Sequence, residues 1–349
     1  MYIAYIVPSL KNAGPVLVVK ELVEKMIKNG HQCIVFYFDN KTELTFLCPT
    51  SKLSFFYAIP FDKFDIIHTH GIRPDAYIFF HKPFHCKTKI ISTLHNYVFR
   101  DFSYQYNKLI AYPCGYLWIT LLLSRHDRIV TLSKDAVKYY QNWIKSSRLT
   151  WAYNTRSLSL QDELNAEEKK QILDFKQDCI LIGANAFLTY RKGLDMLIRA
   201  LDKLPKYKLF IVGEGKVKLR LAQLARECNV YDRVCFAGYH KKAYRYLSYY
   251  DIFAIPSRSE GFPLSLLEAS IVGIPTICSD IAVFKELYSV QEVSFFELEN
   301  IDSLVAAIMH AADSPLYATF LHNKYLREYS PESFFKRYIG IYKSLIPLK

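Results

Sequence analysis

The sequence predicts an α/β protein built from two successive doubly wound halves, each with a parallel sheet. Short runs of β-branched residues alternate with longer segments of helical period, which is typical of βαβ units. This alternation occurs twice, on either side of a polar stretch, Asn154–Lys170, that we expect to be a linker. A length of 349 residues with 51% hydrophobic residues is sufficient for two cores. We therefore expect domains at 1–157 and 158–330, followed by a C-terminal segment at 331–349.

The first half is expected to contain five strands and one clear helix. The helix spans Pro15–Asn29, where apolar residues recur every three or four positions and Gly30 provides a left-handed stop. Its apolar positions are Val16, Val19, Leu22, Val23 and Met26. The expected strands are Tyr2–Val7, Gln32–Phe38, Ile66–Thr69, Lys89–Leu94 and Arg128–Thr131.

The second half repeats this pattern from about Asp178 onward. Its expected strands are Ile180–Gly183, Lys208–Val212, Val234–Ala237, Asp251–Ile255 and Thr276–Cys278. A helix is expected over Leu194–Leu201. Two doubly wound halves of this kind form a ligand crevice at the carboxyl ends of their strands, an arrangement suited to nucleotides and sugars.

The net charge of +12 is concentrated in the first half, because residues 1–156 hold 20 Lys/Arg and 10 Asp/Glu. Such a surplus favours anionic partners, which include phosphorylated ligands, acidic membranes and nucleic acid. The sequence contains no zinc knuckle, helix-turn-helix signature or aromatic-basic RNA motif. A nucleic-acid partner is therefore not expected.

The eight cysteines are scattered, without a CxxC pair or a metal-ligand spacing with His, so reduced thiols are expected and a structural zinc site is not. The opening MYIAYIVPSL has no basic leader or cleavage site and is expected to be a strand rather than a signal peptide. The longest apolar run, Leu109–Leu123, contains Pro113 and falls short of the roughly 20 residues that cross a bilayer. We expect a cytoplasmic protein, soluble or lying on a membrane.

The most informative string runs from Ser257 through Glu260-Gly-Phe-Pro to Glu268, with Gly273-Ile-Pro275 after it. A buried strand leads into this string, and Pro263 is expected at the first helical position, where its missing N–H costs nothing. The start of that helix offers backbone N–H groups and a positive dipole end to a diphosphate. Glu268, about a turn and a half inside the helix, can accept hydrogen bonds from both hydroxyls of a ribose. Glu260 precedes the helix, nearer to where the far end of a nucleotide-linked group would reach.

With this string, the sequence resembles the retaining family-four glycosyltransferases of GT-B fold, whose hallmark is a Glu, seven intervening residues and a second Glu. The resemblance covers essentially the whole chain and implies two Rossmann-like domains that face a central cleft. It implies that Glu268 holds the donor ribose and that Glu260 contacts the transferred sugar. The backbone that would face the sugar and the diphosphate is that of Gly261, Phe262, Pro263 and Leu264.

A basic turn, Tyr190-Arg191-Lys192-Gly193, follows the first strand of the second half. Two cations at a strand-to-helix turn suit a diphosphate, although a solvated basic turn would have the same sequence. The resemblance favours Lys192 as the phosphate contact. The family's usual Gly-Arg-Leu is replaced here by Gly183-Ala184-Asn185, so Arg191 is a candidate to take the place of the missing Arg.

Two further positions in the second half are donor-site candidates. Val212-Gly213-Glu214-Gly215 resembles the family's Val-Gly-x-Gly, where the backbone approaches the nucleotide, but a plain turn explains it almost as well. Tyr239 follows a strand that cradles the base in similar proteins. It could stack on the base or simply pack.

The first half has its own candidates. Gly14, between the first strand and helix, resembles the family's Gly-rich loop that contacts donor phosphate, with Ala13 in place of a second glycine. His95 ends a strand, and the family commonly carries His here against the donor sugar, although a lone His is more often structural. If their strand keeps its pleat, His68 and His70 share a face, and His70 is favoured for the cleft because it is nearer the strand end.

The function that these patterns imply is a retaining hexosyltransferase that moves a sugar from a nucleoside diphosphate, with UDP favoured, to a lipid-linked oligosaccharide, lipopolysaccharide, capsule or O-antigen acceptor. Catalysis would fall to Glu260, His95 and Lys192, without cofactor or metal, because there is no Asp-x-Asp cluster and the cations can stabilise the diphosphate. The family also implies that the helix opened by Ser330-Pro331-Glu332 crosses back to the first domain. A degenerate transferase acting as a scaffold or partner subunit, and less so an epimerase, are the alternatives.

The acceptor side is expected to meet a membrane. The first domain carries Lys11, Lys20, Lys25 and Lys28 around its first helix, and aromatic-rich stretches at Phe99–Tyr106 and Tyr112–Trp118. Cations beside exposed aromatic rings suit the interface of an anionic bilayer. This predicts peripheral association with the inner face of the cell membrane.

Overall fold

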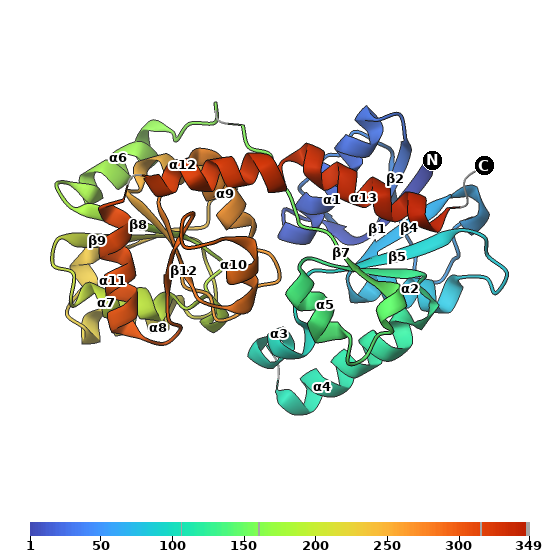
Figure 1. Cartoon of the computed structure of the whole chain (residues 1–349), viewed down its shortest axis with the longest axis horizontal. Helices are drawn as coiled ribbons and strands as arrows, with labels where there is room; N and C mark the ends of the chain where they lie inside the picture. The colour runs from blue at the N-terminus through green and yellow to red at the C-terminus, as the bar shows by residue number, and fades with distance from the viewer. Residues whose placement is uncertain (106, 160, 315, 347–349) are drawn as a thin grey trace. The chain divides into compact units, whose positions relative to one another are not determined.

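The computed structural model describes residues 1–105, 107–159, 161–314 and 316–346, which divide into two compact units (Figure 1). The first unit contains Met1–Arg156 and the chain from Tyr329 onward, and the second contains Ser157–Glu328. The corresponding divisions expected from the sequence fall after residues 157 and 330. Each unit is a parallel sheet with helices on both faces, so the expected doubly wound α/β fold is confirmed.

The sheet of the first unit has seven parallel strands in the order β3-β2-β1-β4-β5-β6-β7. Five of them match the expected strands, with β1 and β2 extending further. The strands are β1 (Tyr2–Leu10), β2 (Gln32–Thr42), β3 (Thr50–Lys52), β4 (Ile66–His70), β5 (Lys89–Leu94), β6 (Arg128–Thr131) and β7 (Leu149–Trp151). The two unpredicted strands, β3 and β7, are three-residue edge strands that are too short for a sequence pattern.

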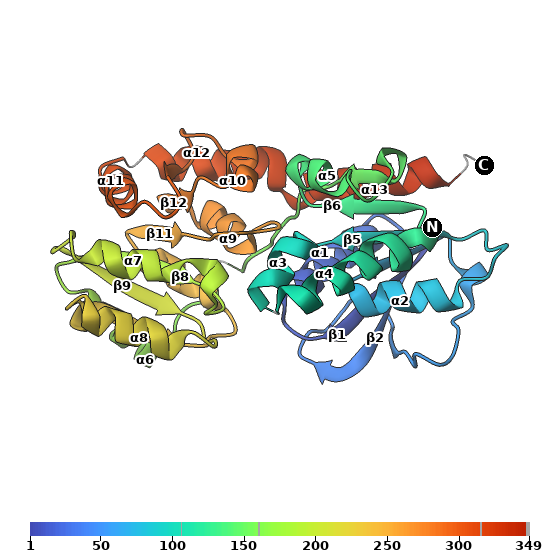
Figure 2. The same cartoon turned by 90° about the horizontal axis from the view of Figure 1, so that it is seen from below.

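Helix α1 (Gly14–Lys28) confirms the first expected helix, and all five of its predicted apolar positions are buried. It ends where Gly30 takes a left-handed φ of 79°. Because the chain leaves β1 and β4 toward opposite edges of the sheet, right-handed crossovers place α1 and α2 on opposite faces (Figure 2). The other helical segments are α2 (Ile72–His81), α3 (Val98–Gln105), α4 (Lys108–Tyr116), η2 (Leu117–Leu121), η3 (Leu122–Arg125) and α5 (Lys134–Tyr140), with single turns η1 (Phe61–Lys63) and η4 (Ser146–Arg148).

The C-terminal helix α13 (Pro331–Leu345) belongs to the first unit and packs beside α1. Ser330 caps it by accepting a hydrogen bond from the Ser333 N–H, and Pro331 occupies its first turn. Its buried face contains Phe334, Tyr338 and Tyr342. The helix that the sequence predicted from Ser330-Pro331-Glu332 is therefore present.

The sheet of the second unit has six parallel strands in the order β10-β9-β8-β11-β12-β13. They are β8 (Ile180–Asn185), β9 (Tyr207–Val212), β10 (Val234–Gly238), β11 (Ile252–Ile255), β12 (Thr276–Ser279) and β13 (Ser294–Phe296). All five expected strands are present, and β13 is a further short edge strand. The chain runs outward from β8 to β10 and then returns to β11, so the order reverses between β8 and β11.

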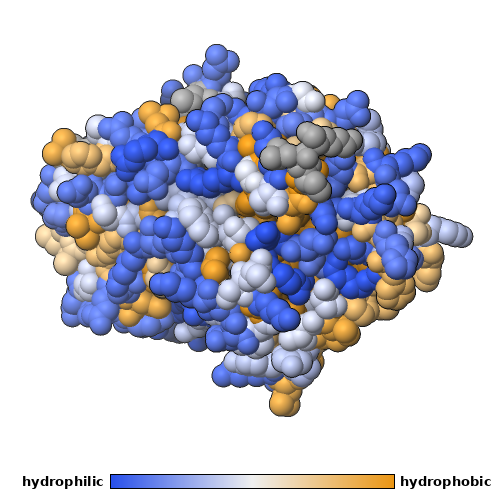
Figure 3. All heavy atoms as spheres, turned by 45° about the vertical axis from the view of Figure 1, so that its right-hand side comes forward, coloured by the Kyte–Doolittle hydropathy of each residue, from blue (hydrophilic) through white to orange (hydrophobic). Residues whose placement is uncertain are grey.

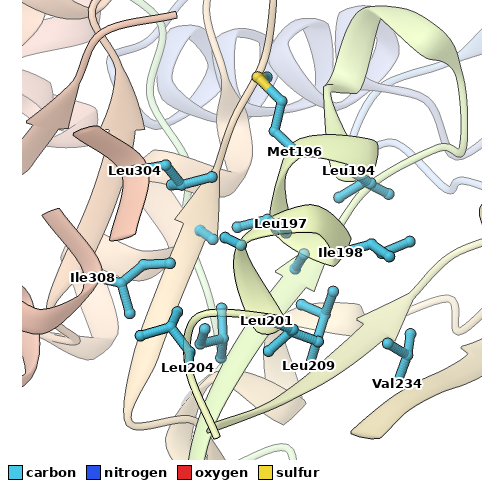
Figure 4. Close-up of a cluster of buried hydrophobic side chains, with 14 of the residues drawn as sticks. Leu194, Met196, Leu197, Ile198, Leu201, Leu204, Leu209, Val234, Leu304 and Ile308 are labelled. Carbon is cyan, nitrogen blue, oxygen red and sulfur yellow. The ribbon is translucent and has the colours of Figure 1, made fainter. Parts of the chain in front are cut away.

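One face of this sheet is covered by α7 (Leu194–Leu201), α8 (Lys218–Glu227) and α11 (Ile301–Ala312). Leucine and isoleucine side chains from α7 and α11 fill the space above the sheet, as Figure 4 shows for Leu197, Leu201, Leu304 and Ile308. The remaining helical segments are α6 (Ala166–Lys176), α9 (Leu264–Val272), α10 (Ala282–Leu287), α12 (Leu316–Lys324), η5 (Tyr190–Lys192), η6 (Tyr231–Arg233), η7 (Ala243–Tyr249) and η8 (Tyr325–Tyr329).

The expected linker over Asn154–Lys170 is wrong in its last part, because α6 begins inside it. Asn165 and Glu168 form a capping box, in which each side chain accepts a hydrogen bond from the other residue's backbone N–H. This satisfies two N–H groups that a helix start otherwise leaves without a partner. Helix α6 has a single buried residue, Ile172, so the cap rather than an apolar stripe marks it in the sequence.

Hydrophilic residues cover most of the face shown in Figure 3, with apolar residues gathered toward its lower right edge. Among the described residues, no single helix has both the length and the apolar character of a membrane span. In the same described part of the chain, one bent pair, Ile301–Ala312 and Leu316–Leu345, meets those criteria when its two parts are taken together. All eight cysteines are free thiols.

Candidate functional site

The second unit brings its predicted site residues together at the carboxyl ends of β8 and β11. These two strands are hydrogen-bonded neighbours, yet the chain leaves them toward opposite sides. In doubly wound sheets this switch point opens the crevice in which ligands bind. The basic turn Tyr190–Gly193 follows β8, and the loop that carries Glu260 follows β11.

Glu260 is 5% exposed and is held by three side chains. Its Oε1 accepts hydrogen bonds from Lys192 Nζ at 2.5 Å and from Ser257 Oγ at 2.7 Å. Its Oε2 lies 3.2 Å from Arg191 Nη1, which also donates to the Ser259 carbonyl. The two cations of the basic turn therefore meet the first glutamate of the motif in this structure.

The electrostatics of this cluster keep Glu260 ionised. Burial by itself would raise the pKa of the carboxyl, but the charges of Lys192 and Arg191, with the hydrogen bonds from Lys192 and Ser257, outweigh it and lower the pKa to about 2. A carboxylate paired in this way cannot serve as a proton donor near neutral pH. It can accept hydrogen bonds and balance positive charge.

The second glutamate of the motif, Glu268, is the fifth residue of α9 and is half-buried. Helix α9 begins at Leu264, so Pro263 is the N-cap residue with a ψ of 108°, and the expectation that it occupies the first helical position is wrong by one residue. The physical reason is that a proline N-cap remains extended while its carbonyl already accepts the first helical hydrogen bond, from the Leu266 N–H. No side chain caps this helix start, and its first turn has no acidic residue. The preceding Gly261 and Phe262 are buried.

Gly193 allows the basic turn to pack against the loop that carries Glu260. It has a φ of 67°, and a Cβ at this position would lie 1.9 Å from the Pro256 carbonyl oxygen. The turn therefore packs directly against the loop that carries Glu260, and only glycine permits that approach. Helix α7 starts immediately afterward, at Leu194, as predicted.

Asn185 stands where the family usually has Leu after its missing Arg, and its side chain is hydrogen-bonded to residues outside this cluster. Its amide donates to the Ala243 carbonyl at 3.0 Å and accepts from Tyr250 Oη at 2.9 Å. The position of the missing Arg itself is Ala184, and Arg191 is an arginine that binds Glu260. This arrangement is what a replacement of the missing arginine by Arg191 requires.

Gly213 and Tyr239 follow β9 and β10 at the same edge of the sheet. Gly213 donates its N–H to the Gly238 carbonyl, and a Cβ here would lie 1.8 Å from the Ala186 carbonyl oxygen. The chain's own packing therefore accounts for this glycine without a ligand. Tyr239 is 61% exposed, so it does not belong to the core, and its ring is accessible.

The first unit repeats this arrangement at its own switch point, between β1 and β4. Gly14 opens α1 directly after β1, with Ala13 as an N-cap residue that makes no side-chain cap. His70 ends β4, and His95 follows β5, the next strand. His70 Nδ1 and His95 Nε2 lie 2.8 Å apart and share one proton in a hydrogen bond.

Both histidines of this pair are neutral. Burial lowers the pKa of His95 to about 4, although the Asp75 carboxylate opposes the shift. Burial, with the neighbouring His68 and His95, also lowers the pKa of His70 well below its ordinary value. His95 can therefore donate or accept one hydrogen bond but is not a cation near pH 7.

His68 and His70 share a face of β4, as predicted, with ring centroids 4.3 Å apart. Their partners differ, however. His68 is bonded to Tyr342 of α13 at 2.7 Å and to Thr93 at 2.8 Å, so both its nitrogens are used in the core. His70 is the one that contacts His95, while its Nε2 is buried and without a hydrogen-bond partner.

Comparisons with known proteins identify the family of this chain. Residues 165–332 match the family model described as "Glycosyl transferases group 1", and residues 13–159 match that of "Glycosyltransferase Family 4". The chain is also 33% identical to the O-antigen biosynthesis glycosyltransferase WclY of Escherichia coli, over 99% of each chain. The chain belongs to the family-four-like glycosyltransferases of GT-B fold. The resemblance that the two-glutamate motif predicted is thereby confirmed.

Solved structures show the same fold for this glycosyltransferase. HepE of Anabaena, determined in complex with UDP and glucose, has a TM-score of 0.81 at 16% identity and covers 99% of this chain and 100% of its own. The lipopolysaccharide outer core galactosyltransferase WaaB, in its apo form, has a TM-score of 0.71 at 16% identity over 99% of each chain.

Two residues of this glycosyltransferase that the sequence did not single out contribute to the site. Ser257 donates to Glu260 and is itself fixed by Ser279 Oγ, which bonds its carbonyl at 2.6 Å. Arg258 is buried, and its backbone N–H donates to the Arg191 carbonyl of the basic turn. Both residues lie inside the motif string, so their position in the sequence could have marked them as site residues. Their partners come from other segments and could not be predicted from spacing.

Within the described part of the chain, no group of three or more His, Cys, Asp or Glu side chains could hold a metal ion.

Proposed function

We propose that this glycosyltransferase transfers a hexose, with retention of anomeric configuration, from a UDP-linked donor to a lipid-linked oligosaccharide of O-antigen or lipopolysaccharide assembly. The observation that carries the proposal is the buried cluster of Glu260 with Lys192 and Arg191 at the switch point of the second unit. Two cations and one carboxylate leave one positive charge beside the uncapped start of α9, an environment that suits a diphosphate.

In this proposal, Glu268 accepts hydrogen bonds from the donor ribose, and the backbone of Gly261, Phe262, Pro263 and Leu264 faces the sugar and the diphosphate. Lys192 and Arg191 retain side-chain exposures of 18% and 22%, so each can turn a donor group toward a ligand while it stays near Glu260. As the bond to the sugar breaks, these cations stabilise the charge that develops on the diphosphate. No divalent ion is then required.

We assign the remaining site residues to the donor as well. Neutral His95 would hydrogen-bond the sugar, oriented by His70. Gly14 at the start of α1 would approach a phosphate, and Gly213 and the exposed Tyr239 would border the nucleotide. The leaving diphosphate would take the proton of the acceptor hydroxyl on the same face, because Glu260, with its pKa lowered to about 2, is a weak base whose oxygens are already paired.

The choices of donor and acceptor rest on relatives. HepE was solved with UDP and with UDP-glucose, which favours a UDP-linked donor. WclY is an O-antigen enzyme, which favours a lipid-linked O-antigen acceptor for a chain that matches it over nearly its full length. Such an acceptor lies at a membrane surface.

An apolar face on α4 and η2 supports membrane association. Six large apolar side chains there are exposed, although the opposite side of the same segment packs in the core through Trp118 and Ile119. The exposed residues are Leu109, Ile110, Tyr112, Tyr116, Leu117 and Leu121. We call this set the α4 face. Exposed contiguous apolar surface of this kind marks an interaction site.

The charges around the α4 face favour an anionic bilayer as its partner. Residues 102–126 contain no Asp or Glu, while Lys108 and Arg125 flank the apolar side chains. The face includes Tyr112, Tyr116 and Leu117 of the predicted Tyr112–Trp118 stretch, while Trp118 itself is buried. Tyr106, the end of the other stretch, lies outside the described residues. We therefore propose peripheral association with the inner face of the cell membrane through the α4 face.

The transfer reaction is tested with a panel of nucleotide sugars and a glycolipid acceptor, followed by product mass and by the anomeric configuration of the new bond. Glu268→Ala is the inactive control, and Lys203→Ala, at an exposed ion pair of the same unit, is the neutral one. Transfer with retention that is lost only in Glu268→Ala supports the proposal. Turnover no greater than that of Glu268→Ala contradicts it, and nucleotide binding without any turnover would indicate a non-catalytic subunit.

Membrane association is tested by sedimentation with anionic and neutral vesicles. Leu109→Glu and Tyr116→Glu should each weaken binding to phosphatidylglycerol vesicles at least about tenfold, because each removes an apolar contact and adds a repelled charge. Leu219→Glu, at a position 85% exposed in the second unit, is the matched control and should bind like the wild type. Equal binding by all four proteins would contradict the assignment.

A further inference from the structure

Arg258 is a buried arginine two residues before Glu260, and its side chain is only 4% exposed. Its position in the motif string would make it a third candidate cation for the donor diphosphate. The structure gives it different surroundings from Arg191 and Lys192, because none of its contacts is with Glu260.

All five N–H donors of the Arg258 guanidinium are used within the protein. Nη1 and Nη2 bind both oxygens of Asp195, at 2.8 and 2.7 Å, in a fork-to-fork pair. Nε and Nη2 bind the two oxygens of Glu299, at 2.5 and 3.1 Å, and Nη1 also donates to the Tyr190 carbonyl at 2.7 Å. An arginine has five such donors, so none remains for a phosphate.

These contacts hold the basic turn from several directions. The guanidinium stacks on the Tyr190 ring at 3.9 Å from its centroid, and the Arg258 backbone N–H donates to the Arg191 carbonyl at 2.8 Å. Asp195 is in the first turn of α7, immediately beyond the basic turn. Arg258 thus binds the backbone carbonyls of Tyr190 and Arg191. The next residue is Lys192, whose ammonium donates to Glu260.

Glu299, which binds Arg258 from another loop, adopts an unfavourable backbone conformation. Glu299 lies in the loop before α11 and has a φ of 66°, the left-handed region that residues with a side chain seldom adopt. In this conformation the Glu299 carboxylate accepts two hydrogen bonds from the Arg258 guanidinium. Arg258 therefore joins the motif loop to the basic turn, to the start of α7 and to the loop before α11.

From this geometry we propose that Arg258 is a positioning residue, which locks the basic turn against the motif loop so that Lys192 and Arg191 remain at Glu260. The proposal rests on the proposed function in one respect, that this cluster is the donor site. It assigns the three cations different tasks, with Lys192 and Arg191 available to the diphosphate and Arg258 reserved for holding them in place. A lysine cannot replace Arg258, because it has neither the planar fork nor the second pair of donors.

The test measures the titration of Glu260 in the full-length protein, which requires no donor or acceptor. Glutamate labelled with ¹³C at the carboxyl is followed by NMR, with Glu260→Gln to assign the signal. The groups that face Glu260 are Lys192, Arg191, Ser257 and, at longer range, Cys278. Wild type should titrate at about 2, and Arg258→Lys should move the pKa upward toward the ordinary 4.5, because the two cations are no longer held.

Arg226→Lys is the matched control, because Arg226 also stacks on a tyrosine of this unit, Tyr231, but lies outside the cluster. An unchanged Glu260 titration in folded Arg258→Lys, or an equal change in Arg226→Lys, would overturn the proposal. If Arg258→Lys does not fold, Asp195→Asn and Glu299→Gln are the substitutes, because each weakens one of the two carboxylate contacts of Arg258. Each should raise the pKa of Glu260 by a smaller amount. No change in either of them would also overturn it.

Activity assays then separate this proposal from the proposed function. If wild type transfers sugar, Arg258→Lys should lower kcat at least tenfold with little effect on the KM of the acceptor. If wild type transfers nothing, the proposed function fails, yet the titration still decides the role of Arg258.

Discussion

Lys192 Nζ lies 2.5 Å from Glu260 Oε1, although 68 residues separate them in the chain. Each belongs to a short loop after one of two neighbouring parallel strands, β8 and β11. Their contact follows from the switch in strand order, which directs both loops over the same edge of the sheet. The pair joins the basic turn and the two-glutamate motif into one cluster.

Lys192→Ala is expected to lower turnover by about 10²–10³-fold, the usual cost of removing a donor that stabilises developing negative charge. The same change should raise the pKa of Glu260, because Lys192 is the first of the charges that lower it. Steady-state kinetics of the donor reaction check the first effect. Lys285→Ala, which breaks the exposed pair with Asp280, should have nearly wild-type kinetics, and an equal loss there would contradict this prediction.

Glu260→Gln and Glu268→Gln are expected to separate turnover from nucleotide binding. Glu268→Gln should weaken the binding of UDP at least about tenfold, since a charged acceptor of two ribose hydroxyls is worth more than a neutral amide. Glu260→Gln should leave UDP affinity within a few fold of wild type but reduce kcat. Calorimetric titration with UDP and kinetics on the same samples check both, and the reverse pattern would exchange the two roles.

Gly193→Ala is expected to destabilise the second unit by more than about 2 kcal/mol, because left-handed geometry costs a non-Gly residue roughly 1–2 kcal/mol and the new Cβ also collides with the Pro256 carbonyl. Gly30→Ala isolates the first contribution, since Gly30 also has a positive φ but a Cβ added there would meet nothing within 4 Å. It should cost roughly 1–2 kcal/mol, the cost of left-handed geometry alone. Chemical unfolding of both variants is the measurement, and equal losses would refute the steric argument.

Stability of the first unit should decrease as pH falls below 6.5. His95 has a lowered pKa of about 4, and those of His68 and His70 are lowered as well. Between the lowered pKa of each histidine and the ordinary 6.5, the unfolded chain binds a proton that the folded chain does not, so each histidine contributes a slope of up to about 1.4 kcal/mol per pH unit. The contribution is fully present above pH 6.5.

The pH effect is measured by thermal unfolding between pH 7.5 and 5. His95→Gln should flatten the decrease, whereas His85→Gln, at an exposed loop position, should leave it unchanged. Glu260 contributes to stability over a lower pH range, because its contribution is lost only as pH falls from about 4.5 toward 2. A wild-type midpoint that stays constant down to pH 5 would contradict the neutral assignment of the histidines.

Much of the fold could be predicted because its strands are buried on both faces. Residues 2–7 of β1 and Ile252–Ile255 of β11 are continuous apolar segments, and the 3.6-residue period of α1 is unambiguous. The edge strands β3, β7 and β13 are three residues long, and neither length nor alternation distinguishes them from loops. Helix α6 was missed because its signal is a capping box on a polar segment.

The site was predicted by residue type but not by contact. The motif identified Glu260, and the basic turn identified Lys192 and Arg191, each as a separate contact to the donor. Their mutual pairing depends on which strands are neighbours and on Gly193 allowing the turn to reach Pro256, and neither is encoded in local spacing. The partners of Arg258 come from residues 190–195 and from Glu299, so its role was outside the reach of a motif.

The second unit is a continuous segment, Ser157–Glu328, inserted into the first, and the chain leaves and re-enters the first unit at adjacent points. Buried Thr155 donates its hydroxyl to the Tyr329 carbonyl at 2.7 Å, so the exit and the return are tied together. An insertion with neighbouring ends can be excised without breaking either sheet. We expect residues 157–328 to fold when expressed alone and to bind UDP, and the first unit to close over a short Gly/Ser bridge between residues 156 and 329, so that nucleotide binding and membrane docking become separable modules.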